Sequence, residues 1–494
     1  MQIPFGEWLP DQPEHNNPGA NIANNVYFAR QSYKRFPSLV SYSSNNIAAD
    51  SRGAGSFRDN SNTVFNFVST NTNIYQLAGG TFTSRKGSLT GSNDDFWTFT
   101  QFGNYVVATN GVDAPQYFLM GTSTNFANLS TIVTSGTLPN FRVSGVIRDF
   151  LVTGNHSNAS NRIQWSGIND IATWQPGTKQ SDLQDLPGSG GQITHITSGE
   201  VGYVFRQNQI IRMDYVGGST VFRLSVISPN RGAVYGRTVC QDNRRVFFYA
   251  DDGFFEINGD EVISIGAEKV NRFFDVDLNK AFSDRICAAV DPFNQLALWL
   301  YPSASNTSNT TGICDKILIY NYATQKWSTA EANASTIFSQ FVGAYTVELM
   351  DIISQNLDQI NIALDTDFWS GGQLLLGAID NNFKAAIFSG TENVGEIETS
   401  EIELFPGTRS NIIGVRPIVD AEATVTIKTR DKLADNSTES SISSMNTTGI
   451  NPVRQSGRYV KFNVKIPSGG AWSDAQGIDI VASRAGLRWQ IKVI

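Results

Sequence analysis

The chain has 494 residues, of which 40% are hydrophobic and 17% are charged, and its formal net charge is −8. A chain of this length and composition can form a core in each of two or three domains, which excludes general disorder. The excess of acidic residues argues against a protein that grips nucleic acid through clustered Lys and Arg. No apolar run approaches the roughly 18 to 20 residues of a membrane-spanning helix. Acidic residues near the N-terminus argue against a secretory signal.

The composition predicts an all-β protein. Its 43 glycines and 31 phenylalanines, together with frequent Asn, Ser and Thr, are typical of short strands joined by tight turns. The three cysteines, Cys240, Cys287 and Cys314, are widely spaced and form no CxxC pair. We therefore expect neither a disulfide framework nor a zinc site, and no cofactor.

The first predicted element is an N-terminal arm, residues 1–55, rich in Pro, Asn and Gly. Its apolar residues follow neither helical nor strand periodicity, which favours a segment that packs along another surface. The candidates for contact with a partner protein are its large apolar side chains, namely Phe5, Trp8, Leu9, Tyr27 and Phe36.

Residues 56–391 contain a repeated strand. A short apolar and aromatic stretch, usually followed by a polar turn and a second such stretch, recurs every 41 to 53 residues. This period matches the roughly 40 to 50 residues of a four-stranded propeller blade. The copies begin at Val64, Tyr105, Phe150, Tyr203, Val246, Leu296 and, less clearly, Ile337. Seven starts predict a β-propeller of seven blades, within a range of six to eight.

Aromatic residues are the expected core of these blades, because stacked blades bury one another's faces. In the sixth copy, Tyr320 and Trp327 flank a turn as the Tyr and Trp of a kelch blade do. The predicted blade-core residues are Trp165, Trp174, Trp299, Tyr320 and Trp327.

Residues 392–494 alternate apolar and polar positions, as in RYVKFNVKI from Arg458. This alternation predicts an antiparallel β-sandwich. Together with the N-terminal arm it is expected to form a platform beside the propeller.

The sequence carries no recognisable catalytic constellation. The three histidines are scattered, and no HExxH, GxSxG or Walker A pattern occurs. We therefore predict no enzymatic activity and no catalytic, cofactor-binding or metal-binding residue. A propeller glycosidase remains an alternative because propellers often hold paired carboxylates near their axis. The acidic turns Asp94, Asp95, Asp251 and Asp252 are predicted to be solvated loop tips or the wall of a negatively charged channel.

Several segments in order resemble the tail-nozzle protein of short-tailed bacteriophages, also called the tail hub or packaged-DNA stabilisation protein. They are IPFGEWLPDQP and SYKRFPSL near the N-terminus, FGNYVVATNGVDAPQYF, RDFLVTG with RIQWSGINDIATW, DDGFFEINGDEVISIGAEKVNRFF, AAVDPFNQLALWLYP and ILIYNYATQKWS. The similarity spans most of residues 1–391 and is weaker beyond Gly395, where it depends mainly on GRYVKFNVKI.

The resemblance implies a structural protein of the virion, made in the host cytoplasm. It implies a homohexameric ring below the portal adaptor that acts as conduit and seal for the genome DNA, with tail fibres or distal tail proteins as further partners. The terminal segments would then face the adaptor, so the arm residues named above become candidate adaptor contacts. DNA would pass through the lumen without specific binding. The alternatives are a tail-associated propeller glycosidase and a glycan-binding adhesin.

Overall fold

The computed structural model describes residues 1–485 except 16, 219, 343–361, 363–368, 370–373 and 471. Nearly all the regular secondary structure of the described residues is β-strand, which confirms the predicted all-β class. A few short helical segments connect strands. They are η1 (Leu129–Thr131), η2 (Gly236–Thr238), α1 (Asn271–Asp277) and η3 (Lys280–Arg285).

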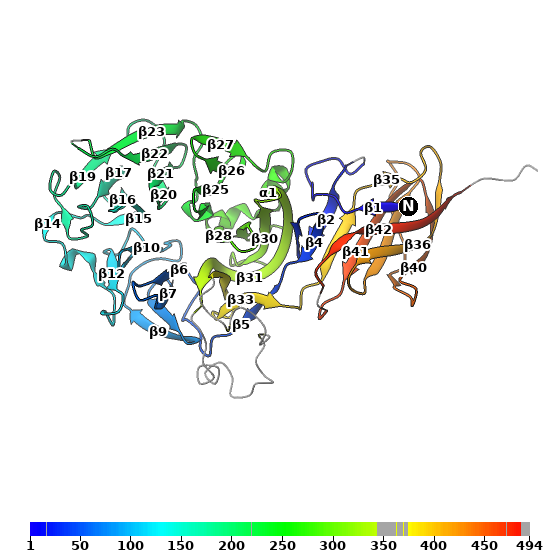
Figure 1. The fold of residues 1–494 in the computed structure, drawn as a ribbon, viewed down its shortest axis with the longest axis horizontal. Helices are drawn as coiled ribbons and strands as arrows, with labels where there is room; N and C mark the ends of the chain where they lie inside the picture. The colour runs from blue at the N-terminus through cyan, green and yellow to red at the C-terminus, as the bar shows by residue number, and fades with distance from the viewer. Residues whose placement is uncertain are drawn as a thin grey trace, which may run out of the picture.

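Small antiparallel sheets surround a common axis and form a β-propeller (Figure 1). Each of the first five blades is a separate four-stranded sheet, and its first strand lies nearest the axis. Blade one contains β6 (Gly53–Arg58), β7 (Val64–Ser69), β8 (Ile74–Ala78) and β9 (Thr81–Lys86), and blade two contains β10 (Thr98–Phe102), β11 (Tyr105–Thr109), β12 (Gln116–Leu119) and β13 (Ala127–Asn128). Blade three contains β15 (Phe141–Ile147), β16 (Phe150–His156), β17 (Ala159–Trp165) and β19 (Asp182–Asp185), with a two-stranded addition, β14 (Ser135–Gly136) and β18 (Thr173–Trp174).

Blade four contains β20 (Ile193–Ile196), β21 (Val201–Arg206), β22 (Ile210–Tyr215) and β23 (Phe222–Ser228), and blade five contains β24 (Cys240–Asp242), β25 (Arg245–Ala250), β26 (Gly253–Asn258) and β27 (Glu261–Ser264). Blades six and seven share one long strand, β31 (Lys326–Phe341). Its first half completes blade six, after β28 (Cys287–Asp291), β29 (Leu296–Tyr301) and β30 (Cys314–Asn321). Its second half is the inner strand of blade seven. The described strands thus form seven blades, as the repeat starts predict.

The N-terminal segment closes the ring. Blade seven continues from β31 through β32 (Leu374–Asp380) and β33 (Ala385–Gly390) to β5 (Ser38–Ser41), which pairs with β33. Blade seven is therefore built from both ends of the propeller segment, and hydrogen bonds between residues distant in sequence close the ring of blades. The propeller begins at β5 rather than near residue 56, because the arm supplies this outermost strand.

The repeat changes register in its last copy. The first six predicted copies coincide with the second strands of blades one to six, from β7 to β29. The seventh, at Ile337, falls on an inner strand instead. The second strand of blade seven is β32, which follows only after residues 342–373, so this long connection interrupts the spacing.

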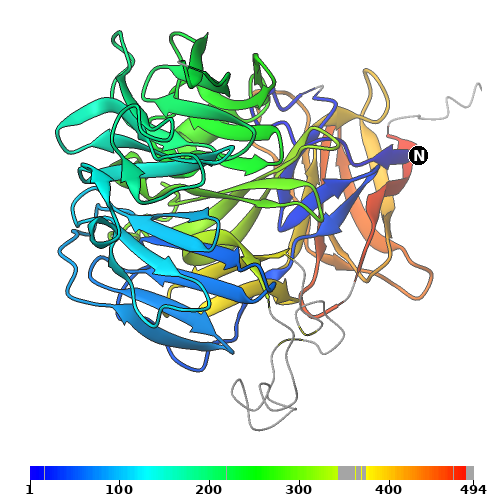
Figure 2. The ribbon, with the colours of Figure 1, turned by 60° about the vertical axis from the view of Figure 1, so that its left-hand side comes forward.

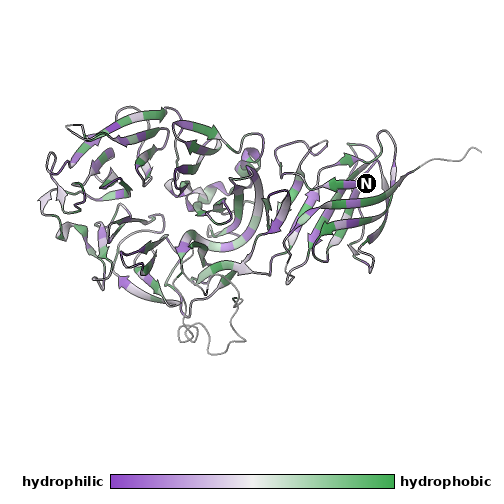
Figure 3. Cartoon of the chain, in the orientation of Figure 1, coloured by the Kyte–Doolittle hydropathy of each residue, from purple (hydrophilic) through white to green (hydrophobic). Residues whose placement is uncertain are grey.

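The remaining strands form a β-sandwich platform from both chain termini, which confirms the predicted platform. One sheet contains β1 (Gln2–Pro4), β3 (Val26–Ala29), β4 (Ser32–Arg35), β42 (Ala475–Arg484), β36 (Ser410–Val419) and β40 (Asn451–Gly457). The other contains β2 (Ala20–Asn24), β34 (Gly395–Thr399), β41 (Tyr459–Ile466) and β37 (Thr424–Arg430), with the short strands β35 (Ile402–Glu403), β38 (Thr438–Glu439) and β39 (Ser443–Ser444). Apolar and polar residues alternate along these strands (Figure 3), and the inward side chains of both sheets share one core.

Platform and propeller are joined through hydrogen bonds and a common core. Strand β2 runs parallel to β31, with Asn24 opposite Thr329, so blade six continues into a platform sheet. The Thr329 hydroxyl donates to the carbonyl oxygen of Ala23 at 3.1 Å. The Lys326 ammonium lies 3.5 Å from the ring centroid of Phe28. Figure 2 shows the platform against this side of the propeller after a 60° turn. The two parts therefore share a continuous framework.

In the described part of the chain, no helix combines the length and the apolar character needed to cross a bilayer.

Candidate functional site

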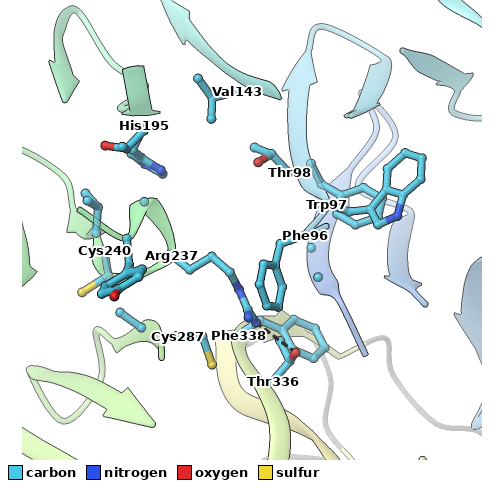
Figure 4. Close-up of a pocket in the computed structure, with 18 of the residues that line it drawn as sticks. Phe96, Trp97, Thr98, Val143, His195, Arg237, Cys240, Cys287, Thr336 and Phe338 are labelled. Atoms are coloured by element: carbon cyan, nitrogen blue, oxygen red, sulfur yellow. Dashed lines mark hydrogen bonds between the residues drawn. The ribbon is translucent and has the colours of Figure 1, made fainter. Parts of the chain in front are cut away.

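A central cavity of about 630 Å³ lies on the propeller axis (Figure 4). Each of the seven blades contributes lining residues from its inner strand. Examples are Ser56 of β6, Val143 of β15, His195 of β20, Cys287 of β28 and Ser339 of β31. The cavity is therefore a product of the closed ring, and no single blade could form it.

Charged side chains gather at one end of this cavity. Asp94, Arg142, Arg237 and Asp284 are the charged lining residues, and each lies before an inner strand or at its start. Inner strands run side by side in the same direction around the axis, so their first residues meet at one end. A contact between blades five and seven agrees with this arrangement. Arg237 lies just before the inner strand of blade five and donates to the hydroxyl of Thr336, near the start of the blade-seven half of β31, at 3.2 Å. The lining has two basic and two acidic residues and is not an acidic wall.

Three guanidinium groups surround the ring of Phe96 at this end. Their central carbons lie 4.2 Å (Arg237), 5.8 Å (Arg52) and 5.8 Å (Arg285) from the ring centroid. We call Arg52, Arg237, Arg285 and Phe96 the arginine cluster. The negative face of the aromatic ring stabilises nearby cations and allows them to lie closer together than they would otherwise.

The arginine cluster is only loosely neutralised. Arg52 lies 3.7 Å from Asp50, and Arg285 lies 3.5 Å from Asp94 and 3.7 Å from Asp284. The Nε atoms of Arg52 and Arg285 are buried without a hydrogen-bond partner in the described structure. Burial, followed by repulsion from Arg285, lowers the pKa of Arg52 to about 10. The Arg52 guanidinium therefore remains charged near neutral pH, and the buried Nε atoms of Arg52 and Arg285 leave donor capacity unused.

The histidine and the thiols of the cavity wall are not poised for catalysis near neutral pH. Burial lowers the pKa of His195 to about 4, so its ring is neutral. Burial raises the pKa of the Cys240 and Cys287 thiols, so both stay protonated. Among the described residues, no group of three or more His, Cys, Asp or Glu side chains is arranged to hold a metal ion.

The four predicted acidic residues lie in three different environments. Asp94 is exposed at the cavity entrance and is the only one of the four to line it. Asp95 forms an ion pair with Arg142 at 3.1 Å. Asp251 and Asp252 occupy the tip of the β25–β26 hairpin, where Asp252 pairs with Arg231. Asp95, Asp251 and Asp252 therefore do not line the propeller cavity, and a negatively charged wall of the DNA channel stays a prediction.

The predicted adaptor contacts pack largely into their own chain. Phe5, Trp8 and Phe36 are buried, with exposed fractions of 4%, 3% and 2%. The Trp8 ring meets Phe273 edge-to-face, with the centroids 4.9 Å apart. Leu9 and Tyr27 are half-buried. The first three side chains thus offer no surface to a second protein, because Phe5 and Trp8 belong to the platform core and Phe36 belongs to the core of blades six and seven.

The predicted blade-core residues lie in or beside the blades and are buried. Trp165 belongs to β17 of blade three, and Trp174 lies in β18 beside it. Trp299, Tyr320 and Trp327 belong to blade six, where their exposed fractions are 0%, 2% and 0%. The indole of Trp299 donates to the carbonyl oxygen of Thr238, just before blade five, and that of Trp327 donates to the carbonyl oxygen of Ile265, just after it, both at 2.9 Å. These residues join adjacent blades as well as filling one of them.

The sequence pattern did not reveal the arginine cluster. Its members are dispersed along the chain, and each precedes an inner strand: Arg52 precedes β6, Phe96 precedes β10, Arg237 precedes β24 and Arg285 precedes β28. The repeat was anchored on the second strands, whose apolar pattern is strongest. The weaker inner strands lie directly before these second strands in the chain. Locating them would have shown that the residues preceding them meet at one end of the propeller.

Comparison with known proteins found similar solved structures at low sequence identity. No family model matches the chain, and no curated protein matches it. One similar solved structure is described as the crystal structure of the mitotic checkpoint complex, with a TM-score of 0.39 and 9% identity over 74% of this chain and 98% of that chain. Another is the Neurospora crassa Pan2 WD40 domain, with a TM-score of 0.39 and 7% identity over 73% of this chain and 96% of that chain.

Proposed function

We propose that this chain is a structural subunit of the tail nozzle of a short-tailed bacteriophage. Six copies would form a ring below the portal adaptor and act as conduit and seal for genome DNA. The chain would have no catalytic role, and it would be made in the host cytoplasm and reside in the virion tail. Tail fibres or distal tail proteins would be neighbours of the ring.

The observation that carries this proposal is the platform. Both chain termini fold into one β-sandwich, and β2 connects that sandwich to blade six through β31. The sequence resemblance implies terminal segments that build a platform beside a propeller, and this arrangement is consistent with it. A subunit of a pressurised conduit also needs a firm connection between its parts, which a continuous sheet and common core provide.

The distribution of charge also supports the proposal. Acidic and basic residues balance within residues 1–37 and 392–494, so the net charge of −8 comes from the propeller segment. A platform without a strong charge excess can pack against copies of itself without large repulsion.

The proposal is tested by attachment of the purified protein to phage heads that carry the adaptor but lack the nozzle. The platform variant is Ile413→Glu, because Ile413 lies on β36 and is 54% exposed. Val226→Glu is the matched control, because Val226 on the blade-four strand β23 is 53% exposed. We expect the wild type and the control to cosediment with heads and Ile413→Glu to do so much more weakly.

Two results would contradict the nozzle proposal. One is a wild-type protein that never cosediments with adaptor-bearing heads. The other is turnover of a fluorogenic glycoside, or tight binding to isolated envelope glycan, which would favour the glycosidase or the adhesin instead. Equal attachment of Ile413→Glu and wild type would show that this face of β36 lies outside the contact.

A further inference from the structure

We propose that the arginine cluster at the end of the propeller cavity binds a small oxyanion of the carboxylate or phosphate class. Arg237 is the principal donor, and Arg285 assists it beside the ring of Phe96. This site is independent of the proposed nozzle function, since it lies in the propeller and not in the platform.

The first argument is the unpaired state of Arg237. Its guanidinium reaches the cavity lining, lies 4.2 Å from the Phe96 centroid and donates one hydrogen bond, to Thr336 (Figure 4). No carboxylate of a described residue lies within ion-pair distance of it. A guanidinium has five N–H donors in a fixed fork that matches carboxylate and phosphate oxygens. Most of that fork remains available.

The second argument is the crowding of positive charge. Arg52 and Arg285 lie beside the same aromatic ring, and each has a buried Nε atom without a hydrogen-bond partner among the described residues. The Nε atom of Arg285 has only the long 3.7 Å ion-pair contact with Asp284. Repulsion from Arg237 and Arg285 contributes to the lowered pKa of Arg52. An anion at this position would reduce that repulsion and accept hydrogen bonds from N–H groups that the protein leaves unused.

The third argument is that the carboxylates that would compete with a ligand for Arg285 are held only weakly. Asp94 is 81% exposed at its side chain and lies 3.5 Å from Arg285, and Asp284 is 39% exposed at 3.7 Å. The Arg285 side chain is 13% exposed, but both carboxylates are solvated and their contacts are long, so each pair contributes little and is readily exchanged. A ligand with two or three acceptor oxygens can displace Asp94 into solvent. The cavity of about 630 Å³ provides room for it.

The site is tested by isothermal titration calorimetry of the full chain at constant ionic strength, with inorganic phosphate and with malonate as separate probes. We expect saturable binding of at least one of them. Phosphate alone would identify a phosphate site, and malonate alone would identify a carboxylate site. Absence of saturable binding by both would overturn the proposal.

Three variants locate the site. Arg237→Gln removes the principal donor and should weaken binding about tenfold or more. Asp94→Asn removes the competitor of the ligand for Arg285 and should tighten binding about two- to fivefold. Arg244→Gln is the matched control, because Arg244 is exposed in the turn before β25, away from the cavity lining, and it should change affinity less than about twofold.

Folding defects are separated from binding defects by the melting temperature of each variant without anion. If Arg237→Gln failed to fold, Asp94→Asn would still decide the matter, because its side chain is largely solvated. Binding that is unchanged in both Arg237→Gln and Asp94→Asn would place the anion elsewhere and refute the assignment.

Discussion

Single residues connect the blades of this propeller, and Trp327 is the clearest example. Its ring is 0% exposed and lies 4.7 Å from the centroid of its cross-strand partner Tyr320. Trp327→Ala should therefore lower the free energy of unfolding by about 3 to 5 kcal/mol, through lost contacts and a residual cavity. Chemical denaturation measures the effect. Phe293→Ala is the control, because Phe293 is 75% exposed. A loss below about 1 kcal/mol for Trp327→Ala would contradict its core role.

A second residue predicts a pH dependence. His156 is 2% exposed, and burial followed by repulsion from Arg162 lowers its pKa to about 4, against 6.5 ordinarily. Between these values the unfolded chain binds a proton that the folded chain excludes. The free energy of unfolding should thus fall as the pH drops from about 6.5 to 4, by up to about 1.4 kcal/mol per pH unit from this group. Above pH 6.5 its contribution should be flat.

The measurement compares denaturant unfolding of wild type and His156→Gln across that pH range. The difference between their unfolding free energies should shrink toward acid, because the variant lacks the titrating ring. A difference that stays constant from pH 7 to pH 4 would show that the pKa of His156 is the same in the folded and the unfolded chain. Arg162→Gln should raise the pKa of His156 in the folded chain by removing the repulsive charge. The loss of stability toward acid should then end at a higher pH.

At the scale of elements, strand β5 has a role that its sequence gives no sign of. It is four residues long and pairs with β33, more than 340 residues later in the chain. Deletion of residues 1–50 removes β1 to β5, and with them the closure of blade seven and one edge of the platform. We expect this truncated chain to lose cooperative thermal unfolding and to aggregate. A chain lacking only residues 1–4 should still melt cooperatively, because it loses just β1.

This expectation revises the idea of a separable docking arm. Phe5, Trp8 and Phe36 are buried in the folded chain, so a truncation that failed to attach to heads would report misfolding and not lost contacts. A truncated chain that remained folded and monomeric would instead show that the arm is dispensable for the fold.

The sequence predicted the strong apolar strands and their hairpin partners, but not the pairings between distant segments of the chain. The second strands, such as β7 and β29, have aromatic and β-branched residues at regular spacing, so local pattern is sufficient to find them. The arm was expected to lack strand periodicity, although it contains β1 to β5. Those strands are short. Apart from the β3–β4 hairpin, they pair with residues hundreds of positions away, and local propensity does not encode such pairing. The arginine cluster escaped detection for the same reason.

At the scale of the whole molecule, the surface should not hold duplex DNA. The 37 basic residues are outnumbered by 45 acidic ones, and several arginines are committed to ion pairs, such as Arg212 with Asp214 and Asp260. Binding of DNA depends on many free Lys and Arg contacts that release counterions. Fluorescence anisotropy with a labelled duplex should therefore remain flat at moderate salt. Tight binding with a steep salt dependence would refute this expectation and favour a DNA-gripping role.

The nozzle account is tested most directly by electron microscopy of adaptor-bearing heads incubated with this protein. It predicts a ring of six copies below the adaptor, with the β-sandwich platform toward the adaptor and the propellers outside a continuous lumen. Docking the structure into the map distinguishes the two ends, because the platform and the propeller differ in size and outline (Figure 1). Copies attached singly at the tail periphery, or a ring whose propeller axes form the only passage, would contradict the account.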